Sequence, residues 1–250
     1  MNYLHIGTKD KTEPLLKRGD RSFLLIDDGP MIDAFNEQFS NARLFDVSHS
    51  AFNPLKGMDY KRARDFATAV YGDKDLMTYR DGKRALTKML LGGRRLDKLP
   101  AVEHKGYEDA AGTVDDILLS PVLRNVLCPA TPNFNFKGIV LAKLDRAAIG
   151  NEDAFLLACL MMLQFQGQIV VPDFGFYGRD FHTSLIRQNR LIACVNFLAE
   201  LPEKLRNAVL LIKDKEAAHC VPKDAEALAG FAGLTPGTNE HTDYIRDRVA

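Results

Sequence analysis

The sequence has few cysteines, no excess of either charge and no long hydrophobic run. Its 33 basic and 33 acidic side chains cancel, so no net field draws the chain of 250 residues to nucleic acid or to an anionic membrane. Any contact with nucleic acid must therefore be local. The four cysteines are widely spaced and form no C-x-x-C pair, which favours free thiols in a reducing compartment over a zinc site or a disulfide.

The hydrophobic runs are too short for a membrane-spanning helix. The longest, AFLLACLMMLQF at residues 154–165, falls short of the roughly 20 apolar residues that such a helix needs. The N-terminal residues lack the basic and then apolar pattern of a signal peptide. We therefore expect no membrane span and a cytoplasmic protein.

Short apolar segments alternate with amphipathic ones along the chain. Seven segments rich in Val, Ile, Leu and Phe predict strands: 3–6, 22–27, 42–47, 138–144, 168–174, 191–197 and 208–214. Segments whose apolar residues recur every three or four positions predict helices between them: 30–39, 60–72, 151–165, 180–190 and 199–208. Apolar strands separated by helices predict an α/β fold, with a mostly parallel central sheet of about seven strands covered by helices. The unbroken apolar character of 138–144 and 168–174 places both in the interior of that sheet.

One region breaks this alternation. From Asp81 to Cys128 the chain contains helical patterns and no strand pattern. We interpret residues 81–128 as a helical insertion within a single α/β domain that spans residues 1–250. Extra helices that cover the same core are the alternative interpretation.

The segment after the first predicted strand resembles a shortened phosphate-binding loop. A nucleotide-hydrolysing α/β domain needs successive backbone N–H groups and a lysine around the phosphates. Gly7, Lys11 and Thr12 follow the strand in the right order and are the nucleotide-binding candidates. The loop is two residues shorter than G-x-x-x-x-G-K-[ST] and has no glycine before the lysine, so it would be a degenerate Walker A motif. A polar turn with solvated lysines is the alternative.

A single carboxylate follows the apolar segment QIVVP. Asp173 stands where the tip of a strand could hold a magnesium-bound water, which makes it a candidate catalytic and metal-binding residue. The next residue is Phe174, and no second carboxylate adjoins it. Asp173 could instead cap the following turn or pair with an arginine. Asp27 and Asp28 end another strand, and an Asx turn leading into the next helix explains them without a ligand.

Basic side chains gather in the last third of the chain. Arg187 and Arg190 lie on the helix that leads into residues 191–197, where an arginine could reach the phosphates of a neighbouring subunit. Surface ion pairing is their alternative role. Five further basic residues predict a local anion-binding face that could contact DNA: Arg179, Lys204, Arg206, Lys213 and Lys215.

The order of these segments resembles the additional-strand DNA-pumping ATPases of the FtsK/HerA type. The resemblance runs from FKGIVLAKLDRAAIGNEDAFLLACLMMLQF through QIVVPDFG and LIRQNRLIACVNFLAELPEKLRNAVLLIKDKE to DAEALAGFAGL. FLLIDDG, ARLFDVS and FNPLKG are similar to the early strands of the family, where an Asn-Pro-Leu turn is frequent. Within the group, the chain looks nearest to the coupling proteins of conjugation and to the genome-packaging ATPases of membrane-containing viruses.

The resemblance implies roles for the candidate residues and also shows what is missing. Asp173 would correspond to the metal-side acid, Asn196 to the sensor at the tip of the next strand, and Arg187 or Arg190 to the arginine finger. The catalytic glutamate expected beside Asp173 is replaced by Phe174, and the phosphate loop is shortened. Without a base and a complete loop, hydrolysis at the speed of a motor is not expected.

Three hypotheses follow for function. The first is a degenerate relative of the DNA-translocating ATPases, inactive or weakly nucleotide-binding, that serves in viral genome packaging or in DNA transfer by a mobile element. The second is an active ATPase with an unorthodox phosphate loop. The third is an unrelated α/β module that binds an anion or a protein. The first two imply ATP or ADP with Mg²⁺ as ligands, and a homo-oligomer or a larger packaging or transfer assembly as the setting.

Overall fold

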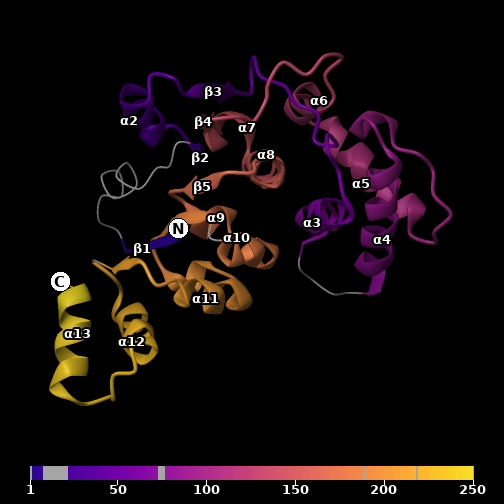
Figure 1. The fold of residues 1–250 in the computed structure, drawn as a ribbon. Coiled ribbons are helices and arrows are strands. Elements are labelled where there is room, and N and C mark those ends of the chain that lie inside the picture. Colours follow the sequence, from indigo (N-terminus) through magenta and orange to yellow (C-terminus); the bar gives the residue numbers. More distant parts are fainter. Residues whose placement is uncertain (1, 8–21, 73–76, 189, 218, 250) are drawn as a thin grey trace. The chain divides into compact units, whose positions relative to one another are not determined.

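The computed structural model describes residues 2–7, 22–72, 77–188, 190–217 and 219–249. Their strands form a seven-stranded sheet in the order β3-β4-β2-β5-β6-β1-β7 (Figure 1). The strand pairs with an assigned register all run parallel. Helices flank the sheet, which confirms the predicted α/β fold with a mostly parallel sheet of seven strands. The strands predicted in the interior, β4 and β5, each have a neighbour on both sides.

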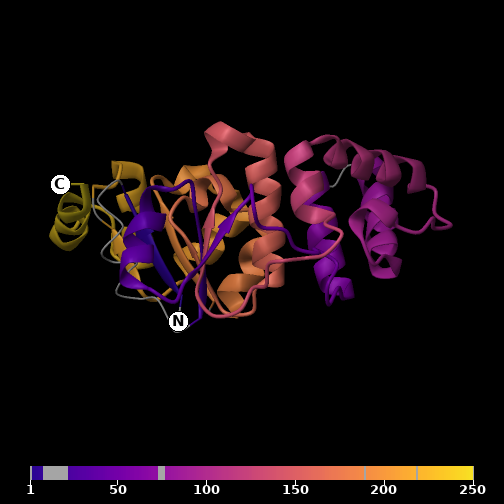
Figure 2. The ribbon, with the colours of Figure 1, turned by 90° about the horizontal axis from the view of Figure 1, so that it is seen from above.

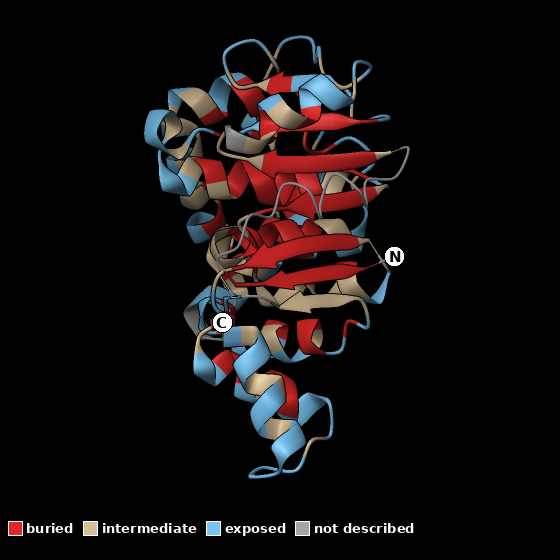
Figure 3. Cartoon of the chain, turned by 90° about the vertical axis from the view of Figure 1, so that its left-hand side faces the viewer, coloured by how far each residue is buried: buried red, intermediate tan, exposed pale blue. Residues whose placement is uncertain are grey.

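The chain divides into two compact units, of which the first comprises residues 1–25 and 167–250. Its strands are β1 (Tyr3–Ile6), β5 (Gln168–Val171), β6 (Leu191–Val195), β7 (Lys215–Ala217) and the first three residues of β2 (Phe23–Asp27). β6 pairs with both β5 and β1, and β1 pairs with β7. All residues of β1, β5 and β6 are buried (Figure 3), as expected of strands that are covered on both faces.

Helices connect β5 to β6 and β6 to β7, and two more follow β7. They are α9 (Phe174–Tyr177), η2 (Asp180–His182), α10 (Thr183–Arg187), η3 (Leu198–Glu200), α11 (Glu203–Leu210), α12 (Pro222–Phe231) and α13 (Asn239–Val249). The buried carboxylate of Asp224 on α12 accepts the N–H of Leu198 at 2.8 Å, and so ties this helix to the turn that follows β6. Helix α13 packs against α12 and has no buried residue (Figure 3).

The prediction of a strand at residues 208–214 is wrong. Residues up to Leu210 belong to α11, and Leu211 is 71% exposed. The ammonium group of Lys215 donates to the carbonyl of Leu210 at 2.9 Å and satisfies the end of this helix. The strand that pairs with β1 begins only at Lys215. Because β7 lies at the edge of the sheet and is only half-buried, no apolar pattern marks it.

The second unit comprises residues 26–166. Its strands and their covering helices are α2 (Pro30–Gln38), β3 (Arg43–Asp46), β4 (Val140–Lys143), α7 (Arg146–Ile149) and α8 (Asn151–Gln164). β3 pairs in parallel with β4, and α2 packs against β4. Most side chains of α8 are buried, so this helix lies in the core of the unit. Its first turn contains Glu152 and Asp153, whose carboxylates interact favourably with the positive end of the helix dipole.

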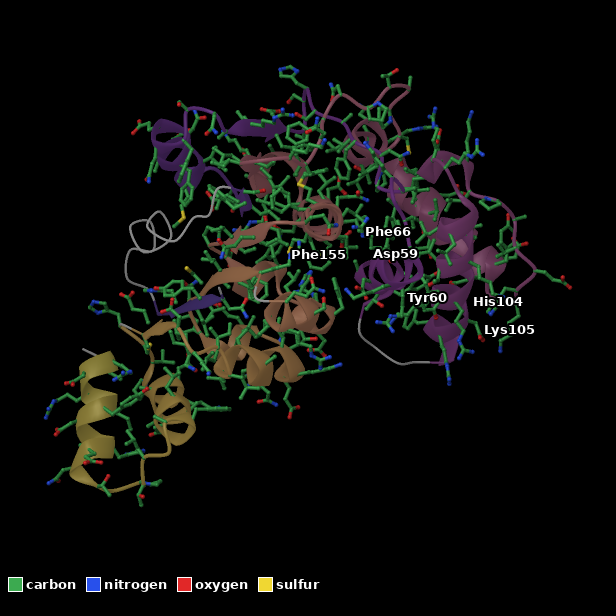
Figure 4. The ribbon with its side chains drawn as sticks, viewed as in Figure 1. Asp59, Tyr60, Phe66, His104, Lys105 and Phe155 are labelled. Atoms are coloured by element: carbon green, nitrogen blue, oxygen red, sulfur yellow. The ribbon has the colours of Figure 1, made fainter. Side chains whose placement is uncertain are left out.

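Four helices and a 3-10 turn connect β3 to β4 within this unit. They are α3 (Tyr60–Tyr71), α4 (Met77–Gly92), η1 (Leu96–Lys98), α5 (Tyr107–Leu119) and α6 (Pro121–Leu127). α4 packs against both α3 and α5, and α5 packs against α6 (Figure 2). α3 also packs against α8; Figure 4 labels Phe66 and Phe155 on these two helices. The described residues between Tyr60 and Leu127 contain helices and no strand, which matches the pattern predicted there. Its status as an insertion into a single domain stays a prediction.

Candidate nucleotide site

Three strands of the first unit end side by side at one edge of the sheet. β6 lies between β1 and β5, and the register places Val195 opposite Ile6 and Ala193 opposite Val171. The N–H of Gly7 donates to the carbonyl of Val195 at 3.0 Å, so the chain leaves β1 beside the tip of β6. Gly7 has a φ of 117°, which residues with a side chain rarely adopt. A glycine is therefore needed at this exit from the sheet.

Gly7, Asp173 and Asn196 are brought to this edge although they are far apart in the sequence. Asn196 follows directly after β6, Asp173 comes two residues after β5, and both are half-buried. In open α/β sheets, the carboxyl ends of the strands form the crevice in which ligands bind. A ligand of this unit is therefore expected at this edge, and the assignment of a nucleotide to it stays a prediction. Lys11 and Thr12, the other two nucleotide-binding candidates, lie outside the described residues.

Asp173 has a structural role at this edge. It is the N-cap residue of α9, and its Oδ1 accepts the N–H of Phe176 at 3.3 Å. This is the capping role that we named as an alternative to metal binding. The capping contact does not test the role of Asp173 as a magnesium ligand, which stays a prediction.

The residue after Asp173 cannot act as a base. Phe174 is fully buried, and the centroid of its ring lies 6.1 Å from that of His182. A hydrocarbon ring cannot accept a proton from a water molecule, and the buried position allows no simple exchange for a charged residue. The position beside Asp173 therefore supplies apolar packing in place of catalytic chemistry.

A second carboxylate that we did not predict comes close to this segment. Glu200, at the end of η3, has its Oε2 only 2.2 Å from the place where a side chain at Gly175 would begin. The carboxylate thus lies over the backbone two residues after Asp173, and Gly175 provides the space for it. Glu200 Oε2 also accepts the N–H of Phe197 at 3.4 Å. This bond closes the turn that follows β6, but Phe197 is not a capping residue, so the sequence carries no signal for the position of Glu200.

The two arginine-finger candidates lie at the opposite ends of the strands, where β5 and β6 begin. Arg190 directly precedes β6, and its carbonyl accepts the N–H of Ile169 at the start of β5. Its Nε donates to the carbonyl of Gly167 at 2.9 Å. Arg187 is exposed at the end of α10, which leads to the same edge. Because β5 and β6 are parallel, neither arginine is brought to Asp173 within one chain.

Most of the basic side chains that were predicted to form an anion-binding face in the last third of the chain bond to the backbone. Arg179, Arg206 and Lys215 donate to backbone carbonyl oxygens at 2.9, 3.1 and 2.9 Å. The short helices of this unit leave carbonyl groups at their ends that need donors, and these cations supply them. Lys204 and Lys213 are the exposed members of the set. DNA binding through this face stays a prediction, with fewer available charges than the sequence indicates.

Asp27 forms the Asx turn that the sequence predicts, whereas Asp28 forms an ion pair that was not predicted. Asp27 Oδ2 accepts the N–H groups of Gly29 and Met31 at 3.0 and 2.9 Å, which forms the turn into α2. Asp28 accepts a hydrogen bond from Nε of Arg146 at 2.7 Å. These carboxylates belong to the second unit and need no ligand to explain them.

The described residues show neither a preformed metal cluster nor a membrane span. Among them, no group of three or more His, Cys, Asp or Glu side chains is placed to hold a metal ion. Within the same residues, no helix has the length and apolar character to cross a bilayer. None of the four cysteines, Cys128, Cys159, Cys194 and Cys220, forms a disulfide within the described part of the chain, and the last three are buried.

Comparison with known proteins links the chain to one solved fold. A comparison with protein-family models finds no match, and a comparison with curated proteins also finds none. The chain is similar in structure to VirB4 of Thermoanaerobacter pseudethanolicus, with a TM-score of 0.61 and 13% sequence identity. The similarity covers 96% of this chain and 82% of that one. At this level of identity the likeness shows a shared fold.

Proposed function

We propose that the chain is a degenerate relative of the DNA-translocating ATPases, which keeps their fold but has lost efficient hydrolysis. The structural likeness to VirB4 supports a distant relation to the ATPases of DNA transfer. The setting would be the DNA-transfer machinery of a mobile element or the packaging machinery of a virus. A homo-oligomer or a larger assembly belongs to this proposal, because Arg187, exposed at the far edge, could serve only a nucleotide held by another copy.

The observation that carries this proposal is the environment of Asp173. The sheet gathers Gly7, Asp173 and Asn196 at the edge where nucleotides bind in related architectures. Directly beside Asp173, where the family resemblance leads us to expect a catalytic glutamate, the chain has the fully buried Phe174. Replacement of a base by a core residue removes the group that orients the attacking water, while the architecture around it persists.

Purified protein is expected to hydrolyse ATP in the presence of Mg²⁺ far more slowly than about 1 per second, the lower end of ordinary enzyme turnover. The reason is that no base adjoins Asp173. Phosphate release can be measured on the wild type and on Asp173→Ala, with Asp33→Ala, an exposed carboxylate on α2, as a control. Turnover near 1 per second that is abolished by Asp173→Ala and kept in the control would refute the loss of function.

The second candidate function is an active ATPase in which Glu200 replaces the missing glutamate. The position of its carboxylate over Gly175, close to Asp173 in the chain, favours this alternative. The substitution Glu200→Gln keeps the shape of the side chain and removes its charge. If Glu200 acts as the general base, Glu200→Gln should lower turnover by about 100-fold, within the range for loss of a general base. Equal phosphate release by the wild type and Glu200→Gln excludes it.

A further inference from the structure

The second unit contains a large cavity whose lining carries positive charge and no carboxylate. Its volume is about 770 Å³, within the range of pockets that hold small-molecule ligands. Its lining comes from residues 52–57 after β3, Arg62 on α3, residues 132–137 before β4, Gln164 at the end of α8 and Gln166 just after that helix. The motif FNPLKG, which the candidate nucleotide site does not use, forms one of these walls.

Aromatic rings form the apolar part of the cavity. Phe134 and Phe136 are half-buried, with ring centroids 5.5 Å apart. Phe52 packs edge-on against Phe136 at 5.0 Å, and Phe45 packs edge-on against Phe134 at 5.1 Å. The two outer rings are thus held in place from behind by buried ones, which gives a rigid apolar surface beside the cavity.

Three cations border the same space. Lys56 and Lys137 are exposed, and neither has an ion-pair partner among the residues that the structure describes. Nη1 of Arg62 donates to the carbonyl of Gly57 at 2.8 Å, and its Nε lies 4.0 Å from the carboxylate of Asp59. Figure 4 shows Asp59 at the start of α3. Positive charge at the cavity is therefore opposed by one carboxylate, which lies outside its lining.

The loops that carry these groups are fixed by hydrogen bonds. Asn133 Oδ1 accepts the N–H of Ala51 at 2.7 Å, and its Nδ2 donates to the carbonyl of His49 at 2.7 Å. Asn53 donates to the carbonyl of Arg94 at 2.9 Å, and Gln164 donates to the carbonyl of Pro54. The walls are therefore preorganised, so that binding does not first have to order the loops.

We propose that this cavity binds a short segment of single-stranded nucleic acid. Its bases would rest against Phe134 and Phe136, and its phosphates would lie near the three cations. Proteins that bind single strands combine aromatic platforms with a positive groove in this way, because an unpaired base offers its ring face. A paired duplex hides those faces, and a purely apolar ligand would leave the cations unused. The inference concerns a second site and does not rest on the proposed function.

The test is fluorescence anisotropy of the full chain with a labelled oligothymidylate of about 12 nucleotides, a length within the usual site sizes, at about 50 mM salt. The double variant Lys56→Ala/Lys137→Ala should weaken binding about tenfold or more. The slope of log affinity against log salt should become shallower by about 1.4, since each phosphate contact to a single strand contributes about 0.7. Both lysines are exposed, so this variant should fold as the wild type does.

Two further variants separate the cavity from general charge and from folding effects. Phe136→Leu keeps apolar volume but removes the ring, and should weaken binding at least about fivefold, as expected for loss of one stacking contact. Lys88→Ala/Lys98→Ala removes the same charge from exposed positions outside the cavity and should leave binding unchanged. If Phe136→Leu fails to fold, the two lysine pairs still decide the question.

Several results would overturn the proposal. They are no binding of the oligonucleotide at low salt, equal weakening by the two lysine pairs, tighter binding of a duplex of the same length, and displacement of the oligonucleotide by an equal nucleotide concentration of thymidine monophosphate. The last result would identify a pocket for free mononucleotides. None of these readouts depends on ATP, so failure here is distinguishable from failure of the proposed ancestry.

Discussion

Replacing Gly106 with alanine is expected to lower the free energy of unfolding by more than about 3 kcal/mol, the upper part of the range for overpacked sites. The added Cβ would lie 2.3 and 2.4 Å from the carbonyl carbon and oxygen of Asp81, and 2.6 Å from the backbone nitrogen of Gly82. These are backbone atoms of α4, so no side-chain rotation can relieve the contact. The N-terminal end of α5 would have to move away from α4.

The surrounding contacts show why α4 and α5 approach so closely. The ammonium group of Lys105 pairs with the carboxylate of Asp81 at 2.6 Å, next to Gly106 in the chain. Figure 4 labels Lys105. Gly106 has an ordinary φ of −92°, so the expected effect comes from space and not from backbone strain. Denaturation by urea, followed by circular dichroism, measures the change.

A second glycine on the same helix provides the control. Gly112 is exposed on α5, and a side chain there would meet nothing within 4 Å. Gly112→Ala should raise the free energy of unfolding by about 0.5 to 1 kcal/mol, because alanine has the higher helix propensity. Similar stability of Gly106→Ala and the wild type would show that α4 and α5 do not pack as described.

Lowering the pH from 7.5 to 5 is expected to remove about 2 kcal/mol of stability through His182 alone, at about 1.4 kcal/mol for each pH unit below the ordinary pKa. Burial, helped by the nearby charge of Arg179, lowers the pKa of His182 from 6.5 to about 3. Its Nδ1 accepts the N–H of Arg179 at 3.0 Å, so the ring proton is on Nε2. Nε2 has no hydrogen-bond partner among the described residues. The centroid of the Phe181 ring lies 4.1 Å from that of the His182 ring.

The sign follows from the difference between the two states. The folded pKa lies below the unfolded one, so the unfolded chain takes up a proton as the pH falls below about 6.5 while the folded chain does not. Stability therefore declines from there toward pH 3, where the loss from this group would reach about 4 kcal/mol. Above pH 7 the group contributes no pH dependence.

The variant His182→Leu isolates this contribution. The variant loses the acceptor for Arg179 at every pH, so only the change in the difference between wild type and variant matters. That difference should shift by about 2 kcal/mol in favour of the variant between pH 7.5 and 5. His219→Asn, at an exposed position with a φ of 54° that asparagine tolerates, should leave the pH dependence unchanged. Parallel curves for wild type and His182→Leu would refute the buried neutral histidine.

Much of the fold could be predicted because buried parallel strands carry a strong signal. Residues such as Ile169, Val170 and Ile192 are apolar because both faces of their strands are covered. Edge strand β7 escaped prediction since half-exposed Lys215 and Glu216 meet no such demand. Helix α13 was missed for the same reason, because it buries no residue and so shows no apolar periodicity.

The candidate site was predictable only in part. The position of Asp173 and Asn196 at the carboxyl edge of the sheet could be predicted because a polar residue one or two positions after a buried strand lies there. The approach of Glu200 to Gly175 depends on the path of the chain after β6, which sequence spacing does not encode. The sequence also does not show which partners Arg179 and Arg206 have. Their positive charges predict an anion site, but in the structure both donate to backbone carbonyls.

Calorimetric titration of ADP and ATP with Mg²⁺ tests the central claim of a decayed nucleotide site most directly. The incomplete set of groups at this edge should still bind the nucleotide at about millimolar strength, or roughly 4 kcal/mol. Lys11→Ala should abolish this heat, and Lys17→Ala, which removes the same charge from the same segment, should preserve it. Binding at about micromolar strength or tighter, lost in Lys11→Ala and kept in Lys17→Ala, would contradict the account, because a decayed site could not provide it.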